Sequence, residues 1–348
     1  MGHTRTTYGW QATGGSTELT KVPVERRALR PDDIAVRVDH CGVCFSDLHA
    51  LHGLTEGTLI PGHEFTGTVI ATGPDAGRFA VGDRVAVGNI VDSCGSCPMC
   101  VRGQENYCEN FPTLTYGGTD RVDGTRTQGA YAREYVLRET FAHHLPDGLD
   151  PAGAAPLMCA GVTVWEPLRA AGIGPGSRVA VAGLGGLGHL AVKFAAALGA
   201  EVTVLSRNAG KADDARALGA TGLLVTTDER QTAEARGRFD LIVDTISAPH
   251  DLAPLLGLLA LDGTLSVVGH LGEVQVKVLD LLIGRKKLTS SGSGGLPATA
   301  EMLEFCAEHR ITAEVEVLPS ARAGEALERL ERGDVRYRFV LDLADLDG

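Results

Sequence analysis

Four cysteines crowd into one short stretch of the chain and supply its clearest chemical signal. Structural zinc sites bind the ion through four thiolates in a tetrahedron, and C-x-x-C spacing lets one turn present several sulfurs. Glycine and proline stand between the thiols and favour the tight turns that such a site needs. A disulfide framework is the alternative, but it is typical of small secreted chains. The spacing therefore predicts a structural zinc site with the ligands Cys94, Cys97, Cys100 and Cys108.

A glycine-rich turn is the second signal, because Gly183, Gly185 and Gly188 follow the G-x-G-x-x-G pattern. The pattern stands between a strand-like and a helix-like segment, as in a βαβ unit that binds a dinucleotide. The first glycine permits a tight turn, the second lets a pyrophosphate approach, and the third packs helix on strand. Amides at the helix start then hold the phosphate charge. A purely structural turn is the alternative. We expect the cofactor to contact Gly183, Leu184, Gly185, Gly186, Leu187 and Gly188.

The residues after position 205 indicate which nicotinamide cofactor binds. An acidic residue at the end of the second strand would bind the ribose 2′-hydroxyl of NAD. The chain instead has Ser206 and Arg207 there, with Lys211 just beyond. A hydroxyl with two cations suits a 2′-phosphate, although the two cations are alternatively a solvated pair at a helix start. The sequence predicts NADP(H).

Three more residues are candidate metal ligands, although they lie far apart in the chain. His63 precedes Glu64 in a Pro-Gly-His-Glu motif, Cys44 lies upstream, and Cys159 stands where the second half begins. Each is ambiguous when taken separately. A lone histidine on a strand is more often a core residue than a ligand, and single buried cysteines behave as small hydrophobes.

Taken together, these motifs resemble those of the zinc-dependent medium-chain alcohol dehydrogenases, and most of all the cinnamyl-alcohol-dehydrogenase-like branch. The resemblance covers essentially the whole chain. It implies an α/β protein in which an irregular β-rich, GroES-like catalytic domain accompanies a doubly wound, parallel-sheet Rossmann domain. The matching motifs are Cys41-Gly-Val-Cys44, Pro61-Gly-His-Glu64, Cys159-Ala-Gly-Val-Thr-Val164 and Gly183-Leu-Gly-Gly-Leu-Gly-His189.

The resemblance implies a catalytic zinc with Cys44, His63 and Cys159 as its three ligands. Three protein ligands leave the fourth position open to exchange water for substrate. Glu64 is by the same resemblance the carboxylate that approaches the metal when that position empties. Asp47 is the acceptor that orients the imidazole of His63 and raises its basicity as a ligand.

The resemblance also implies a proton relay, and the chain departs from the pattern of its relatives at two positions. Ser46 is expected to contact the substrate oxygen, and His49 to pass the proton to solvent. Thr163 joins the expected cofactor-binding residues. Phe45 stands where many relatives carry a basic residue or histidine that reaches the cofactor phosphates. Gly292 stands where plant enzymes tend to have a bulky side chain, which predicts a roomier substrate pocket.

The elements that must position these residues change in character along the chain. Up to about residue 150, short β-branched segments separated by turn residues indicate an irregular β-rich domain. From about residue 155, six apolar strands alternate with alanine-rich helical segments, and strands buried on both faces are typical of a doubly wound parallel sheet. We place the catalytic domain at 1–154 and 291–348 and the dinucleotide-binding domain at 155–290. The six predicted strands are 178–182, 201–205, 222–225, 240–244, 263–268 and 287–290.

Composition narrows the classes of protein. With 348 residues the chain is long enough for about two domains, each with its own core. No apolar run approaches the length of a membrane span. A formal net charge of -12 argues against nucleic acid and an anionic membrane surface as partners. The opening residues carry no apolar signal segment, so we expect a cytoplasmic enzyme, and the resemblance suggests a homodimer.

The leading hypothesis is an NADP(H)-dependent zinc enzyme with two zinc ions per chain that interconverts primary alcohols and aldehydes, with aromatic or bulky ones expected. An NAD-dependent polyol dehydrogenase is the alternative among enzymes, and an acidic residue at position 206 would have favoured it. A dinucleotide-binding protein without turnover is the alternative from another class, since function lies in sites rather than in folds.

Overall fold

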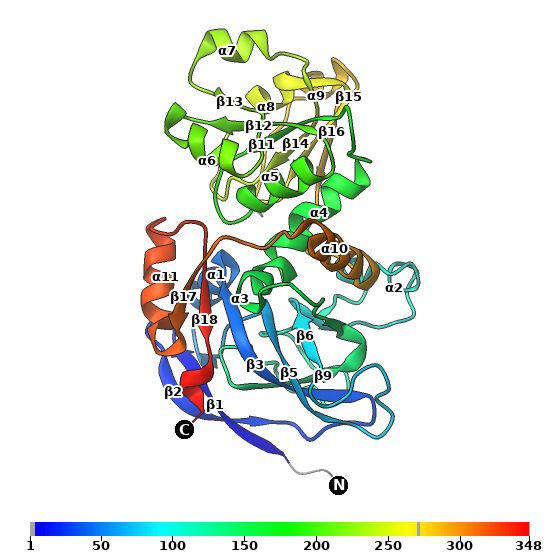
Figure 1. Ribbon diagram of the computed structural model, residues 1–348, viewed down its shortest axis with the longest axis vertical. Coiled ribbons are helices and arrows are strands. Elements are labelled where there is room, and N and C mark those ends of the chain that lie inside the picture. Colours follow the sequence, from blue (N-terminus) through cyan, green and yellow to red (C-terminus); the bar gives the residue numbers. More distant parts are fainter. Residues whose placement is uncertain (1–3, 270–271, 348) are drawn as a thin grey trace. The chain divides into compact units, whose positions relative to one another are not determined.

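The computed structural model describes residues 4–269 and 272–347 (Figure 1). The chain forms two compact units, one made of Met1–Cys159 with Gly294–Gly348 and the other of Ala160–Ser293. The domain borders expected from the sequence, 154/155 and 290/291, stay predictions. Among the described residues, none of the helices combines the length and apolar character needed to cross a membrane.

The first unit is built around a seven-stranded sheet, in the order β10-β6-β5-β3-β18-β17, with β9 also paired to β3. Residues 33–36 and Val38 of β3 are fully buried, so the first half of this strand is covered on both faces. Two smaller sheets, β2-β1-β4 and β7-β8, complete the β-rich unit. Its strands are β1 (Arg5–Thr13), β2 (Thr20–Arg26), β3 (Asp33–Val43), β4 (Thr58–Leu59), β5 (Phe65–Thr72), β6 (Arg84–Val87), β7 (Ile90–Asp92), β8 (Thr113–Leu114), β9 (Glu134–Arg138), β10 (Ala142–His144), β17 (Val315–Pro319) and β18 (Arg338–Asp342).

The C-terminal part of the chain returns to this unit, and β18 pairs with β3 in antiparallel register, with Phe339 opposite Val43. The end of β3 leads directly into α1, so β18 lies beside the segment that carries Cys44. The helices of the unit are α1 (Phe45–His52), α2 (Pro98–Val101), α3 (Pro151–Ala154), α10 (Leu296–His309) and α11 (Ala323–Glu331), with the 3-10 helices η1 (Glu105–Tyr107), η2 (Glu139–Phe141), η3 (Ala155–Met158), η5 (Ser320–Arg322) and η6 (Ala344–Leu346).

The second unit contains a six-stranded sheet in the order β13-β12-β11-β14-β15-β16, in which every neighbouring pair is parallel. This order is that of a doubly wound dinucleotide-binding fold, and the strand order reverses between β11 and β14. Residues Val179 to Ala182 of β11 are at most 1% exposed, as the apolar sequence predicts for a strand covered on both faces. The strands are β11 (Arg178–Ala182), β12 (Glu201–Ser206), β13 (Gly222–Val225), β14 (Phe239–Asp244), β15 (Leu259–Val267) and β16 (Lys287–Ser290).

The helices of the second unit are α4 (Ala160–Ala170), α5 (Gly188–Ala197), α6 (Ala212–Ala217), α7 (Glu229–Glu234), α8 (Ala253–Leu258) and α9 (Val278–Leu282), with the 3-10 helix η4 (Ala209–Lys211). The glycine turn lies between β11 and α5, as expected. The prediction of an α/β protein with a β-rich unit and a doubly wound unit is confirmed.

Candidate functional site

The structure of the first unit brings together the three dispersed candidate ligands. Ligand atoms of Cys44, His63 and Cys159 all lie within 4.8 Å of one another, and His63 Nε2 lies 3.3 Å from Cys159 Sγ. Cys44 is the N-cap of α1, His63 lies just before β5, and Cys159 follows η3. Two sulfurs and one imidazole nitrogen are a donor set that zinc prefers, and three protein ligands leave one position open. The residues present therefore fit a catalytic zinc.

The carboxylate of Asp47 sets the orientation of the histidine. Asp47 has no exposed surface, and its Oδ1 lies 3.0 Å from His63 Nδ1. The same carboxylate accepts the amide hydrogens of Gly62 and Cys44, each at 3.0 Å. These bonds hold the carboxylate at the start of α1, so His63 Nδ1 faces an acceptor and Nε2 faces the two thiols. Such a carboxylate–histidine pair is the usual support of a metal ligand.

The charges of this group favour a cation. Hydrogen bonds from Cys159 and then from His63 outweigh burial and hold the pKa of Cys44 well below its usual value. The hydrogen bond to Cys44 and burial raise the pKa of Cys159. Burial alone would lower the pKa of His63, but Asp47 and Cys44 raise it well above the ordinary value. A metal ion would take the place of the protons that these groups share, because thiol and imidazole ligands bind a metal in their deprotonated forms.

Glu64 lies next to His63 in sequence, but its carboxylate is paired with Arg338 of β18. Glu64 is fully buried and Arg338 is 5% exposed. Burial, only partly offset by the charge of Arg338, raises the pKa of Glu64 to about 8. One carboxylate oxygen, Oε2, has no hydrogen-bond partner within the described residues. Glu64 is thus close to the ligands without belonging to the cluster of three ligand atoms.

Two tyrosines surround the histidine and its carboxylate, and the sequence reasoning missed both. The ring of Tyr116 meets the ring of His63 edge-on, with centroids 5.6 Å apart. Tyr131 is fully buried, and its hydroxyl lies 3.5 Å from Asp47 Oδ2. Arg338 was missed as well. No local pattern marks these residues, because each reaches the site through pairings between segments distant in sequence.

The candidate relay residues lie on α1, directly after the first ligand. Ser46 Oγ is 3.7 Å from Cys44 Sγ, and both Ser46 and His49 are exposed. Their spacing of three residues places them on the same face of the helix. Phe45 is 38% exposed at the start of this helix.

The cysteine cluster forms as the spacing predicts. Its four sulfurs lie within 4.8 Å of one another, and all eight cysteines are free thiols, so the disulfide alternative is not realised. Gly95 adopts a φ of 69°, which few other residues tolerate, and the amide of Cys97 donates to Cys94 Sγ at 3.4 Å. Backbone amides of Ser96 and Cys97 lower the pKa of Cys94 to about 5. Four sulfurs around one point fit a structural zinc.

In the second unit, the structure shows why glycine stands at each of the three positions of the turn. Gly183 has a φ of 89°. A Cβ on Gly188 would lie 2.1 Å from the carbonyl oxygen of Gly183, whereas a Cβ on Gly185 would meet no atom within 4 Å. The turn is therefore tight at its first and third glycines and open at its second. That open place is where the backbone leaves room for a pyrophosphate.

The residues expected to select the cofactor lie near this turn. Ser206 ends β12, Arg207 follows it, and Lys211 donates through Nζ to the carbonyl oxygen of Leu184 at 3.0 Å. Because Leu184 belongs to the turn, this bond attaches the ammonium of Lys211 to it.

Thr163, the remaining expected cofactor-binding residue, is buried, and its hydroxyl accepts the amide hydrogen of Ser293 at 3.1 Å.

Comparison with known proteins agrees with this geometry. Residues 30–147 match the alcohol dehydrogenase GroES-like domain, and residues 186–308 match the zinc-binding dehydrogenase family. NADP-dependent alcohol dehydrogenase C 1 of Mycolicibacterium smegmatis is 45% identical over 98% of this chain and 99% of its own length.

Solved structures are similar over nearly the whole chain. A cinnamyl alcohol dehydrogenase from Sorghum bicolor has a TM-score of 0.93 at 40% identity, and covers 97% of this chain and 98% of its own. CAD from Helicobacter pylori, complexed with NADP(H), has a TM-score of 0.89 at 30% identity, and covers 98% of this chain and 99% of its own. The resemblance stated from the motifs is confirmed. The chain belongs to the zinc-binding dehydrogenases with an alcohol dehydrogenase GroES-like domain.

Proposed function

We propose that the chain is a zinc-dependent alcohol dehydrogenase that uses NADP(H) to interconvert primary alcohols and aldehydes, with bulky or aromatic ones preferred. The observation that carries the proposal is the convergence of two thiols and an imidazole in the first unit, with a buried carboxylate behind the imidazole. A protein that only bound a dinucleotide would have no need of this second metal site.

Cys44, His63 and Cys159 hold the catalytic ion, and the cysteine cluster holds a structural one. When bound, zinc supplies Lewis-acid polarisation of a carbonyl oxygen, and the reduced nicotinamide supplies hydride. Asp47 keeps the His63 proton on Nδ1, so that Nε2 presents its lone pair to the metal. The Arg338 pairing keeps the carboxylate of Glu64 in place beside the ligands.

Ser46 and His49 manage the proton. Ser46 donates its hydroxyl hydrogen to the substrate oxygen as the carbonyl is reduced, because hydride transfer leaves a basic alkoxide that needs a proton. His49 lies one helical turn further and is exposed, so its imidazole can take up a proton from solvent and return it to the relay. Alcohol oxidation uses the same residues in reverse.

The preference for NADP(H) rests on the end of β12. Ser206 supplies a hydroxyl there, and the Arg207 and Lys211 cations supply charge for a 2′-phosphate. No carboxylate stands at position 206 to accept a hydrogen bond from a 2′-hydroxyl. A preference for bulky substrates rests on Gly292, which is exposed and where a Cβ would meet no atom within 4 Å.

The proposal includes a homodimer, supported by an apolar face on the second unit. β16 is an edge strand, and such an edge leaves backbone hydrogen-bonding groups unpaired. Six large apolar side chains of the segments that precede it in the chain are between 41% and 78% exposed, and exposed apolar surface of this kind is typical of an interaction surface. They are Leu261, Val274, Val278, Leu279, Leu282 and Ile283. Sedimentation should show a wild-type dimer and a monomeric Leu282→Glu variant. A monomeric wild type would refute the dimer.

The expected cytoplasmic location is testable by cell fractionation.

A panel of aliphatic and aromatic aldehydes, assayed with NADPH on protein of known zinc content, tests the function. We expect two zinc ions per chain and turnover that is fastest with aromatic aldehydes. One zinc per chain and no turnover would favour the dinucleotide-binding alternative. Turnover of polyols with NAD would favour the polyol dehydrogenase.

A further inference from the structure

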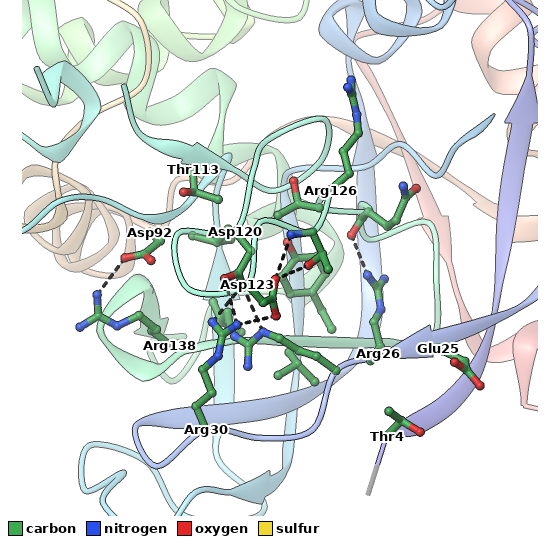
Figure 2. Close-up of a pocket in the computed structure, with 18 residues that line it drawn as sticks. Thr4, Glu25, Arg26, Arg30, Asp92, Thr113, Asp120, Asp123, Arg126 and Arg138 are labelled. Atoms are coloured by element: carbon green, nitrogen blue, oxygen red, sulfur yellow. Dashed lines mark hydrogen bonds and ion pairs between the residues drawn. The ribbon is translucent and has the colours of Figure 1, made fainter. Parts of the chain in front are cut away.

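The loop of residues 117–127, in the first unit, is held by ion pairs and by hydrogen bonds to Thr113 and Leu114 rather than by a core. None of its residues is buried. Its own hydrogen bonds fold it into a hairpin, since Gly117 donates to Thr127 and Asp120 accepts from Gly124. Together with β2, β7 and β9 it borders a cavity of about 310 Å3 (Figure 2). Apolar packing therefore contributes little to its position.

Arg30 makes the principal ion pairs to this loop. Its guanidinium donates to both carboxylate oxygens of Asp120 at 2.9 Å and to Asp123 at 2.8 Å. Figure 2 shows these bonds as dashed lines from Arg30 to the two aspartates. The Arg30 side chain is 21% exposed and that of Asp120 is 13% exposed. We call Arg30, Asp120 and Asp123 the Arg30 network. Two further attachments are the ion pair of Arg27 with Asp120, at 3.5 Å, and the bond of Arg121 to the carbonyl of Phe111.

Both ends of the loop contact the segment that carries His63. At one end the Tyr116 ring lies against the His63 ring. At the other end, Gln128 Oε1 accepts the amide hydrogen of Ile60 at 2.8 Å, and the backbones of 129–131 pair with those of 60–62. Buried Arg26 already fixes this second end, through bonds to the carbonyls of Gln128 and Gly129. At the other end, fully buried Thr115 bonds to Gly88 and Asn89, so Tyr116 stands between this anchor and the loop.

We propose that the Arg30 network is a positioning device for the catalytic metal site, because it holds the 117–127 loop so that Tyr116 stays packed against His63 and slows release of the metal. The inference rests on the proposed function, since it requires a zinc at Cys44, His63 and Cys159. Arg30 acts through Tyr116 and is a positioning residue. A bidentate, partly buried pair with a second carboxylate is stronger than an isolated surface pair.

The test is the rate at which a chelator removes each zinc ion from the purified holoenzyme. The Cys44→Ser variant, which should retain only the structural ion, assigns the two phases. In Arg30→Gln we expect release of the catalytic zinc to be about three- to tenfold faster. Release of the structural zinc should be unchanged. Arg30→Lys should recover part of the difference, because it keeps one charged contact.

Arg126→Gln is the matched control. Arg126 lies in the same loop and is exposed, and across residues 4–269 and 272–347 its side chain has no ion-pair partner. Figure 2 shows it pointing away from Asp120 and Asp123. Its zinc release should match the wild type. High salt should speed release from the wild type and leave Arg30→Gln unaffected, because salt screens partly exposed pairs.

Asp123→Asn, a milder change at a carboxylate that is 40% exposed, covers the case in which Arg30→Gln does not fold. Two bound zinc ions with unchanged catalytic-site release in these variants would overturn the inference and leave the proposed function standing. Equal acceleration at both zinc sites would overturn it too, since that indicates general loosening. A wild-type protein with one zinc would refute the proposed function, and the inference with it.

Discussion

His63 and Asp47 meet at 3.0 Å between Nδ1 and Oδ1, with Asp47 fully buried and His63 4% exposed. The other imidazole nitrogen is thereby turned towards Cys159 Sγ, 3.3 Å away. Asp47 is itself held by two backbone amides, one from the segment of Cys44 and one from the segment of His63. One carboxylate thus joins the start of α1 to the segment before β5 and sets the geometry of the metal site.

Asp47→Asn should weaken binding of the catalytic zinc by about 10- to 100-fold, because the amide cannot hold the histidine tautomer as a carboxylate does. Competition with a chelator of known affinity measures this. Asp213→Asn, a change at a carboxylate that is 96% exposed, is the control and should bind zinc as the wild type does. Equal affinities in all three proteins would show that Asp47 does not support the ligand.

Cys97→Ser should lose one zinc ion per chain and lower the free energy of unfolding, because a structural site couples metal affinity to folding. Metal analysis and urea denaturation measure the two effects. Cys306→Ser is the control, since Cys306 is fully buried and outside both cysteine groups. It should destabilise the protein through the buried hydroxyl and yet keep both ions. A Cys97→Ser protein with two ions and unchanged stability would contradict the assignment.

Ser206→Asp combined with Arg207→Ala should move the preference from NADPH towards NADH. A carboxylate at position 206 repels a 2′-phosphate and accepts a hydrogen bond from a 2′-hydroxyl. We expect the ratio of kcat/KM values to change by at least about tenfold, equal to about 1.4 kcal/mol. Arg216→Ala, at an exposed arginine paired with Asp213, is the control. Wild-type enzyme that prefers NADH would refute the prediction before any substitution is made.

The protein should lose stability in acid partly through His143. Burial, assisted by the charge of Arg78, lowers the pKa of His143 to about 4, while the unfolded chain has a value near 6.5. The unfolded state therefore binds more protons between these values. The contribution, at most about 3 kcal/mol, is present above pH about 6.5 and is lost as the pH falls towards about 4.

His143→Gln removes this titration, so its free energy of unfolding should fall less than that of the wild type over that range. Urea denaturation at several pH values measures the difference. The exposed His309, replaced by glutamine, should follow the wild-type curve. Parallel curves for His143→Gln and the wild type would mean that burial of this histidine does not contribute to acid sensitivity.

The sequence was sufficient to predict the structure where that structure depends on a local pattern of residues. Strand β11 occupies the predicted residues 178–182, and the glycine turn and cysteine cluster depend on neighbours in sequence. The strand-like residues 131–136 form a strand only from Glu134 on, because the backbone of Tyr131 pairs with Pro61 instead. Pairing between distant segments decided that boundary.

The same reason explains which site residues the sequence could not reveal. Arg338 reaches Glu64 only because β18 returns beside β3, across a separation of 274 residues. Tyr116 reaches His63 from the start of a hairpin that the pairing of Asp120 with Arg30 joins to a distant segment. An arginine or tyrosine in such places carries no periodicity or spacing that sets it apart from a surface or core residue.

The measurement that tests the central claim most directly is aldehyde reduction with NADPH by Cys159→Ala beside the wild type. Removal of one catalytic ligand should lower kcat at least about a hundredfold, the scale of losing one electrostatic contact to the transition state. The variant should keep the zinc of the cysteine cluster and bind NADPH as the wild type does. A Cys159→Ala enzyme with wild-type kcat would contradict the proposed role of the three ligands in catalysis.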